Sequence, residues 1–451
     1  MSLPGRGPQA ASLSRADVVP DSIAAPRPAR DLSAHAWYAL PRVIFSGDNE
    51  VELLRGGDML FPAMRRAIER AQRDIWLATY IFHDDPPSLL LADALCGAAR
   101  RGVRVRVVID GFGSGASLAA LTRRFEAADV DLAVFRPLSG WRSWLQPGQL
   151  RRLHQKLCVV DDEIGFVGGI NVLDDRFDLR IGPMAEPRLD FAVRVRGPVV
   201  APVEQTARAV WTRAAFGQDW RDEMVALSRA SQPLKQVRSL LRNLRMPDSR
   251  QFVMPNQSSI APMRAAFVLR DNLRQRRTIE RGYVDAIRKA RERVDLVCPY
   301  FYPGNRFRRA LRHAARRGVR VRLLMQGVWD YRAAALAARA LYAELLARGV
   351  RIYEYTPAHL HAKVAVVDDD WATVGSSNID PLSLLLNLEA NVIVRDRDFT
   401  AALSAEIDTA IAASREITMA EAGGRINQLR RSFVAWCAGI FMRVAGATGR
   451  Y

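Results

Sequence analysis

The feature that most constrains this chain is an internal repeat, in which four short blocks occur twice in the same order. The first two pairs are Ala99-Arg-Arg-Gly-Val-Arg-Val-Arg-Val-Val108 with Ala315-Arg-Arg-Gly-Val-Arg-Val-Arg-Leu-Leu324, and His154-Gln-Lys-Leu-Cys-Val-Val-Asp161 with His361-Ala-Lys-Val-Ala-Val-Val-Asp368. The other two are Gly168-Gly-Ile-Asn171 with Gly375-Ser-Ser-Asn378, and Leu189-Asp-Phe-Ala-Val-Arg-Val195 with Leu388-Glu-Ala-Asn-Val-Ile-Val394. The spacings of 216, 207, 207 and 199 residues predict two homologous halves.

Each predicted half alternates helical and strand patterns, which is typical of a mixed α/β layer fold. In the first half we expect helices at 63–71, 87–101 and 118–128, and strands at 75–82, 103–109, 131–135, 156–161, 163–167 and 191–195. The first half is predicted to span 39–222 and the second 263–415, joined by a basic amphipathic linker at 223–262. Residues 1–38 lack an apolar core and are expected to be disordered, and residues 416–451 are expected to form an amphipathic, membrane-associating tail.

Composition narrows the class of partner rather than the fold. The chain has 451 residues and a formal net charge of +18, which favours an anionic partner: a nucleic acid, an anionic lipid surface, or both. The four cysteines show no metal-ligand spacing and three lie in apolar runs, which predicts buried thiols in a reducing compartment. No run reaches the roughly 18 uncharged apolar residues of a spanning helix, and no signal peptide is recognisable.

The second repeated block carries the chemistry, because the pattern His-x-Lys-x4-Asp-x6-Gly-[Gly/Ser]-x-Asn is complete in both halves. On a strand, residues i and i+2 share a side, so each His and its Lys would face one cavity, while Gln155 and Ala362 face away. Burying a Lys beside a His is unfavourable unless an anionic ligand lies between them. An ammonium group repels a divalent cation but suits a phosphate, so we predict a phosphate site with no metal or other cofactor.

These motifs resemble the duplicated His-Lys-Asp signature of the phospholipase D superfamily, over about residues 45–400. Within that superfamily the chain is most similar to the bacterial cardiolipin synthases of the shorter, peripheral subtype. The segments that carry this likeness include Tyr80-Ile-Phe-His-Asp-Asp85, Phe166-Val-Gly-Gly-Ile-Asn171 and Trp371-Ala-Thr-Val-Gly-Ser-Ser-Asn-Ile-Asp-Pro-Leu-Ser383. The resemblance implies two α-β-α sandwich halves packed face to face, with the active site at their interface.

The resemblance also implies roles for the motif residues. One histidine attacks the phosphodiester phosphorus, and the other protonates the leaving alcohol and then deprotonates the incoming one. By resemblance His154 is the nucleophile and His361 the acid/base, although the near-symmetry of the repeat leaves that order open. The residues expected to hold the non-bridging phosphate oxygens are Lys156, Lys363, Asn171, Asn378 and Ser376, with the backbone at Gly168, Gly169 and Gly375.

Four carboxylates belong to the same constellation. Asp190 and Glu389 occupy equivalent repeat positions and are predicted to orient the two imidazoles, and the resemblance leaves open which carboxylate serves which histidine. Asp161 and Asp368 complete the catalytic motif, and we interpret them as supports of the motif loops rather than proton carriers.

Three features favour a lipid over a nucleic acid as the substrate. Trp141 and Trp144 lie in a loop at 136–150, and tryptophan prefers the membrane interface. Residues 433–442 are uncharged and flanked by arginines, and the arginine excess suits an anionic lipid surface. Apart from these features, residues 233–245 form an amphipathic pattern. For both segments, an interfacial membrane helix and an ordinary helix packed on the body remain open interpretations.

We therefore expect a cardiolipin synthase that transfers a phosphatidyl group from one phosphatidylglycerol to the glycerol hydroxyl of another. It would act on an anionic membrane surface, at the cytoplasmic face of the bacterial inner membrane, and would bind no nucleic acid. The alternative is a phospholipase D-type hydrolase or nuclease of the same fold, and a third hypothesis is a basic binding protein without catalysis. Headgroup preference, partner proteins and oligomeric state stay open.

Overall fold

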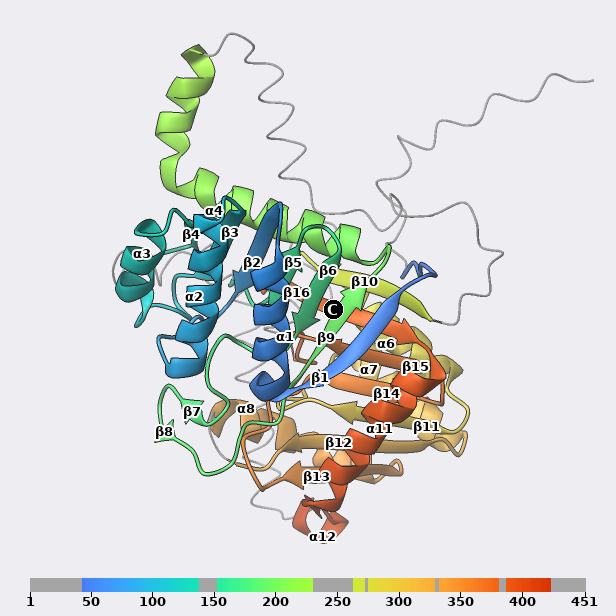
Figure 1. Ribbon diagram of the computed structural model, residues 1–451. Coiled ribbons are helices and arrows are strands. Elements are labelled where there is room, and N and C mark those ends of the chain that lie inside the picture. The colour runs from blue at the N-terminus through green and yellow to red at the C-terminus, as the bar shows by residue number, and fades with distance from the viewer. Residues whose placement is uncertain are drawn as a thin grey trace, which may run out of the picture. The chain divides into compact units, whose positions relative to one another are not determined.

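Two β-sheets, one from each half of the sequence, form the frame of the chain (Figure 1). The computed structural model describes residues 43–137, 152–229, 263–271, 275–328, 332–380 and 387–422. All of them fall within the compact unit that begins at Pro41.

The first sheet has seven strands in the order β1-β9-β6-β5-β2-β3-β4. These strands are β1 (Glu50–Arg55), β2 (Asp74–Thr79), β3 (Arg104–Asp110), β4 (Asp131–Phe135), β5 (Leu157–Val160), β6 (Ile164–Gly168) and β9 (Phe191–Arg196). β2, β3 and β4 run parallel, whereas β5, β6, β9 and β1 pair antiparallel. The helices of this half are α1 (Gly56–Arg70), α2 (Pro86–Arg100), α3 (Leu118–Glu126) and α4 (Val200–Arg229).

The second sheet repeats this order as β10-β16-β15-β14-β11-β12-β13 and adds β17 at its edge. Its strands are β10 (Arg264–Arg270), β11 (Arg293–Val297), β12 (Arg320–Gln326), β13 (Val350–Tyr355), β14 (Val364–Val367), β15 (Trp371–Gly375), β16 (Glu389–Arg395) and β17 (Ser414–Glu416). The helices are α6 (Thr278–Lys289), α7 (Asn305–Arg316), α8 (Arg332–Arg339), α9 (Tyr342–Leu346), α11 (Arg397–Ala412) and α12 (Met419–Ala422). The matching strand orders confirm the predicted α/β fold of two homologous halves.

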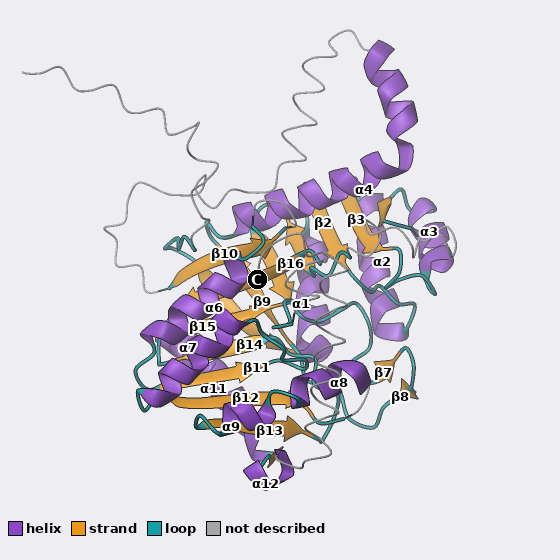
Figure 2. Cartoon of the chain, turned by 180° about the vertical axis from the view of Figure 1, so that it is seen from behind, coloured by secondary structure: helices purple, strands orange, loops and turns teal. Residues whose placement is uncertain are grey.

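Alternation along β2 shows how each half becomes a three-layer sandwich. Ile75 and Leu77 join the cluster that contains the apolar sides of α1 and α2, whereas Trp76 and Ala78 join the cluster that contains α4. In the second half, α6 and α7 cover one face of the sheet (Figure 2), and α11 packs against the other. Side chains two apart share a face, so one strand serves both layers.

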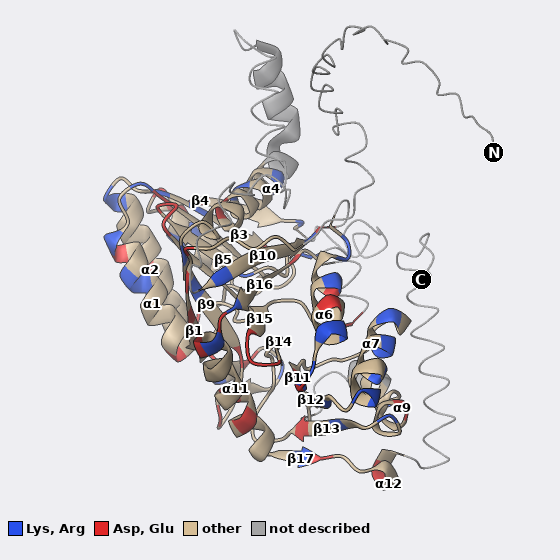
Figure 3. Ribbon diagram, turned by 90° about the vertical axis from the view of Figure 1, so that its right-hand side faces the viewer, with Lys and Arg blue, Asp and Glu red and all other residues tan. Residues whose placement is uncertain are grey.

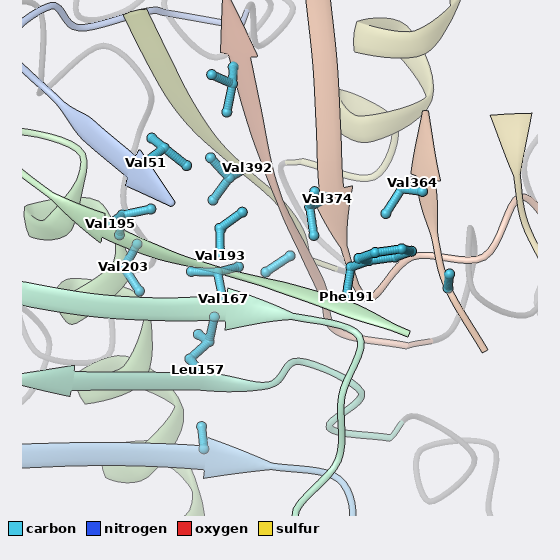
Figure 4. Close-up of a cluster of buried hydrophobic side chains, with 14 of the residues drawn as sticks. Val51, Leu157, Val167, Phe191, Val193, Val195, Val203, Val364, Val374 and Val392 are labelled. Atoms are coloured by element: carbon cyan, nitrogen blue, oxygen red, sulfur yellow. The ribbon is translucent and has the colours of Figure 1, made fainter. Parts of the chain in front are cut away.

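One apolar cluster joins the two halves. Val167 and Val193 of the first sheet lie in the same cluster as Val374 and Val392 of the second (Figure 4). All four are almost completely buried. Because apolar burial is the dominant favourable term in folding, this shared core fixes one half against the other and so fixes the place where their motifs meet.

Local sequence explains where several elements begin. The Asp85 side chain accepts a hydrogen bond from the Ser88 N–H at the start of α2, and Pro86 follows as the first helical residue. Asp396 caps α11 through the Phe399 N–H in the same way. The prediction for β4 matches residue for residue, whereas α1 begins at Gly56, seven residues before the predicted start, with Pro62 inside it.

Two strand predictions were too long, and both errors concern the site. The strand predicted over 75–82 ends at Thr79, and Phe82 forms only an isolated bridge with Val172. The strand predicted from Lys156 begins at Leu157, so His154 and Lys156 precede the sheet instead of lying within it. The backbone at Leu153 and His154 pairs instead with Leu388 of the opposite half, an interaction that the local pattern does not reveal.

The segments between and beyond the halves are described only in part. Helix α4 continues through the predicted boundary at residue 222, and β17 pairs with β13 at the start of the predicted tail. The rest of the predicted linker, the 1–38 segment, Trp141 and Trp144, and 433–442 lie outside the described residues. Within the described ranges, no helix has the length and apolar character needed to cross a membrane. Cys96, Cys158 and Cys298 are buried free thiols, as predicted.

Candidate active site

Each motif histidine is attached through its backbone to the opposite half of the chain. The His154 N–H donates to the Leu388 carbonyl at 3.1 Å, and the His361 N–H donates to the Leu189 carbonyl at 2.9 Å. Each leucine directly precedes a carboxylate that was predicted to orient a histidine. The two motif segments are therefore held at the interface between the halves.

The imidazole–carboxylate pairs also cross between the halves, which settles the pairing that the sequence left open. His154 Nδ1 lies 3.0 Å from Glu389 Oε2, and His361 Nδ1 lies 2.6 Å from Asp190 Oδ2. The side chains of Glu389 and Asp190 are 0% and 1% exposed. Since each Nδ1 is bound to a carboxylate, Nε2 is the nitrogen left for chemistry on both rings.

The two motif lysines are buried beside these pairs. Lys156 is 6% exposed and Lys363 is 1% exposed, and each ammonium group donates to the carbonyl of the histidine two residues before it. Burial and then the Lys363 charge lower the pKa of Lys156 to about 7, and burial lowers the pKa of Lys363 to about 8. Because the lysine charges oppose each other across the halves, a bound anion would favour the protonated form of both.

The two imidazole–carboxylate pairs differ in how firmly they hold a proton. Burial lowers the pKa of His154, and although burial alone would raise the pKa of Glu389, the charge and hydrogen bond of His154 bring it below its ordinary value. Burial raises the pKa of Asp190 to about 7, while burial and Lys363 lower the pKa of His361. Near neutral pH the first pair is thus a carboxylate with a neutral imidazole, whereas the second pair gains or loses a proton in this pH range.

Ser376 and Gly169 explain part of this difference. Ser376 was expected to hold phosphate oxygens, but its Oγ donates to Glu389 Oε2 at 2.6 Å, where it stabilises the ionised carboxylate. The equivalent residue in the first half is Gly169, and any Cβ at this position would overlap Asp190 Oδ1. The Gly169 N–H donates to the Phe191 carbonyl, and a contact between the Gly169 backbone and the substrate stays a prediction.

The neighbouring glycines also serve the fold. Gly168 donates its N–H to the Lys156 carbonyl at 3.3 Å, and Gly375 donates to the Lys363 carbonyl at 3.2 Å. The backbone of Ala192 passes so close to Gly168 that a Cβ there would lie 2.5 Å from the Ala192 Cα. Both N–H groups therefore have partners within the fold, and substrate binding at Gly168 and Gly375 stays a prediction.

The remaining motif residues are two aspartates that support the motif loops and two asparagines. Asp161 accepts the backbone N–H groups of three consecutive residues, 72–74, and Asp368 accepts those of 291–293, which fits the structural role predicted for both. Asn171 is buried and its Oδ1 has no hydrogen-bond partner among the described residues. Asn378 Oδ1 lies 3.8 Å from the Cys298 thiol. The two asparagines thus retain polar groups near the site.

A matched pair of residues that the sequence analysis missed fixes the motif segments from behind. Asp110 Oδ2 accepts the Leu153 N–H at 2.9 Å, and Gln326 Oε1 accepts the Leu360 N–H at 2.9 Å. Asp110 and Gln326 end the equivalent strands β3 and β12, and Leu153 and Leu360 directly precede the two histidines. The sequence did contain a signal for this pair, because a polar residue stands two positions after the end of each copy of the first repeated block.

Two further residues were missed in the first half. Gln155, predicted to face away from the cavity, is completely buried, and its Nε2 donates to the Glu389 carbonyl of the opposite half at 3.2 Å. The Tyr80 ring centroid lies 5.2 Å from that of His154 and 5.6 Å from the Lys156 Nζ. Tyr80 follows β2 directly, in a segment that had been interpreted as sheet.

Comparison with known proteins identifies relatives that match both halves. A family model described as "Cardiolipin synthase, PLD-like domain" matches residues 64–181 and 283–411. Cardiolipin synthase B of Escherichia coli strain K12 is 38% identical over 369 residues, which cover 81% of this chain and 81% of that protein. Cardiolipin synthase B of Salmonella typhimurium strain LT2 is 40% identical over 368 residues, which cover 79% and 78% of the two chains.

More distant matches agree with the fold. Cardiolipin synthase A of Pseudomonas fluorescens is 32% identical over 390 residues, which cover 86% of this chain and 74% of that protein. The crystal structure of a phosphatidylserine synthase from Haemophilus influenzae covers 91% of this chain with a TM-score of 0.58 and 15% identity, and 97% of that chain is matched. At this identity the structural match shows the fold alone.

Proposed function

The chain belongs to the family of phospholipase D-like cardiolipin synthases, and from this premise we propose that it joins two phosphatidylglycerol molecules into cardiolipin and releases glycerol. The observation that carries the proposal is the pair of histidines at the interface, each fixed through Nδ1 by a carboxylate of the opposite half. Two buried lysines beside them supply positive charge for a phosphodiester.

In the first step, His154 acts as the nucleophile. Its imidazole is neutral near pH 7 and its Nδ1–H points to Glu389, so the Nε2 lone pair is free to attack phosphorus. The bond between phosphorus and the headgroup glycerol oxygen breaks, and a phosphatidyl–histidine bond forms. The pair of His361 and Asp190 holds an additional proton, which passes from His361 Nε2 to the leaving glycerol oxygen.

In the second step, the glycerol hydroxyl of another phosphatidylglycerol takes the place of the product glycerol. Its proton passes to His361 Nε2 while its oxygen attacks phosphorus, and the bond to His154 breaks. The site returns to its starting protonation and the product is cardiolipin. The reaction exchanges one phosphodiester for another, so it requires no oxidant, reductant or nucleotide.

The lysines and asparagines stabilise charge on the phosphoryl oxygens. Lys156 comes from the first half and Lys363 from the second. Their charges interact across the interface, since the charge of Lys363 lowers the pKa of Lys156. The Asn171 and Asn378 amides add neutral donors. Fixed donors in a buried site stabilise developing charge more than mobile water does, because they are already oriented.

We further propose that the enzyme works as a peripheral protein at the cytoplasmic face of the bacterial inner membrane, on an anionic lipid surface. The formal net charge of +18 supports attraction to such a surface. Part of this charge lies on the outside of α7, where arginines line the helix (Figure 3).

Product analysis tests the proposal directly. Purified protein is incubated with phosphatidylglycerol vesicles in the presence of EDTA, and the lipids are identified by mass spectrometry. Cardiolipin with an equal amount of glycerol is the expected result. Phosphatidic acid as the main product would identify a hydrolase, and cleavage of single-stranded DNA under the same conditions would identify a nuclease.

A further inference from the structure

The first half contains a hairpin in a connection that is shorter in the second half. Asp190 follows Asn171 by 19 positions, whereas Glu389 follows Asn378 by 11, so the first half has eight additional residues between matched site positions. They accommodate the two-stranded sheet β7 (Phe177–Asp178) and β8 (Gly182–Pro183). Since the second half forms the same strand order with the shorter connection, the fold itself does not require the hairpin.

The hairpin carries apolar side chains into solvent at its tip. Leu179 is 46% exposed and Ile181 is 59% exposed, and Arg180 lies between them. Figures 1 and 2 both place β7 and β8 at the edge of the chain, apart from the two large sheets. Of the seven large apolar side chains exposed in the described ranges, two occupy this three-residue tip.

The base of the hairpin is fixed to the active site. The Phe177 ring centroid lies 5.3 Å from that of His83, in the segment that begins with Tyr80 beside His154. Arg188 donates to the Phe177 carbonyl at 3.1 Å, and its charge is one of those that lower the pKa of His361. The tip and the site are therefore parts of one braced segment rather than independent surfaces.

The chemistry of the tip selects its occupant. Two aliphatic side chains separated by an arginine combine apolar anchors with a cation that pairs with phosphate, which is the composition of an interfacial lipid-binding element. Arg176 lies at the base of the hairpin with its side chain 48% exposed, and it forms an ion pair with Asp58 Oδ2 at 3.2 Å. The formal net charge of +18 favours an anionic surface over a neutral one.

We propose that the β7–β8 hairpin inserts Leu179 and Ile181 into a phospholipid surface, with Arg180 among the headgroups, and so places the interface between the halves against the lipids. This inference rests on the proposed function, because a lipid substrate is the reason for the site to lie against a membrane. The docking itself does not depend on which product is formed. Insertion supplies substrate from the bilayer to a site whose histidines remain attached to the rigid sheets.

A fluorophore at the tip tests the insertion. An environment-sensitive label is attached to Ile181→Cys in a Cys437→Ser background, because the three other cysteines are buried. The matched control carries the label at Met419→Cys, since Met419 is 49% exposed on α12 of the second half. With phosphatidylglycerol vesicles that sediment the protein, we expect a blue shift at position 181 and none at 419. An unchanged spectrum at 181 on sedimented protein, or no sedimentation, overturns the proposal.

Substitution then connects insertion with turnover. Leu179→Ser with Ile181→Ser should lower vesicle binding about tenfold or more, whereas Met419→Ser should leave it unchanged. The double variant should retain wild-type turnover of short-chain phosphatidylglycerol dissolved below its micelle concentration. Equal binding losses in the two variants contradict the proposal. Vesicle insertion without any cardiolipin formation would instead refute the proposed function while leaving the docking intact.

Discussion

The two halves have the same strand order but differ in the side chains around the site, and the difference is larger behind the histidines than at them. His154 and His361 each bind a carboxylate, and each is followed by a buried lysine. Behind them the halves diverge: Glu389 against Asp190, Ser376 against Gly169, Asp110 against Gln326, and Gln155 against Ala362. The duplicated fold thus places the two histidines and two lysines symmetrically, and the few residues behind them give the two histidines different chemical environments.

This divergence gives the two histidines different protonation. Glu389 has a serine donor and a pKa below its ordinary value, so it remains ionised and orients a neutral His154. Asp190 has a pKa raised by burial to about 7, so the Asp190–His361 pair takes up or releases a proton near neutral pH, as the proposed acid requires. Catalysis needs one base that attacks and one acid that donates, and environments that separate paired pKa values provide both.

Removing either histidine should cause the largest loss, but the two variants should respond differently to the leaving group. We expect His154→Ala and His361→Ala each to lower turnover by roughly 10⁴-fold or more, with unchanged circular dichroism. A nitrophenyl leaving group needs no proton, so it should restore first-step cleavage to His361→Ala but not to His154→Ala. Equal restoration in both variants would mean that the halves are interchangeable.

Adding one methyl group at Gly169 should disturb the second pair alone. The new Cβ of Gly169→Ala would displace the Asp190 carboxylate from His361, and we expect a loss of about 10²-fold in kcat. Gly304→Ala is the matched control, because its methyl group would meet nothing within 4 Å. Wild-type kcat in Gly169→Ala would show that Asp190 does not need its present position.

The supports of the motif segments should affect kcat more than KM. Asp110→Ala removes the acceptor for the Leu153 N–H and should lower kcat about ten- to hundredfold. Gln326→Ala removes the acceptor for the Leu360 N–H and should also lower kcat. Its effect should be smaller, because Asp110 additionally accepts from the Phe112 and Gly113 N–H groups. Gln326→Glu keeps the acceptor and should retain activity.

Thr206→Val provides the stability control for these variants, since it removes one buried hydrogen bond within α4. It should lower the free energy of unfolding by about 0.5–1.5 kcal/mol and leave kcat unchanged. If Thr206→Val lowers kcat as much as Asp110→Ala does, the effect of Asp110 is general destabilisation rather than positioning.

The smallest predicted effect is a change in pH dependence at Ser376. Ser376→Ala removes a donor to Glu389, so the depressed pKa of this carboxylate should rise. Activity requires ionised Glu389 and is lost as the pH falls through its pKa, so the acidic limb of kcat/KM should move up by about one pH unit. The alkaline limb should stay in place, as should both limbs in Ser377→Ala. An unshifted acidic limb would separate Ser376 from the titration.

The sequence predicted the two-half α/β fold and the residues of the site because the repeat contains both the strand patterns and the motif residues. His154, Lys156 and Asp190 recur as His361, Lys363 and Glu389 at equivalent positions, and these residues do gather at the interface. The strand pattern also placed most elements within a few residues, since apolar alternation reflects burial on the two faces of a sheet.

What the sequence could not provide depends on how the halves pack. Each carboxylate binds the histidine of the other half. This pairing depends on how the two halves pack against each other, and the spacing of residues along the sequence does not determine it. A serine hydroxyl donates equally well to a phosphate or to a carboxylate, so the partner of Ser376 appears only in the structure. Asp110 ends a buried strand, where a polar residue is ordinarily taken for the start of a loop.

The most direct test of the non-equivalent histidines is to trap the covalent intermediate and find its position. Wild-type protein and His361→Ala are mixed with a nitrophenyl phosphatidyl ester, quenched with alkali to preserve phosphohistidine, digested and sequenced by mass spectrometry. The adduct should lie on His154 in both proteins and accumulate in His361→Ala. An adduct on His361 in the wild type, or on both histidines in equal amount, would contradict the assignment of distinct roles to the two halves.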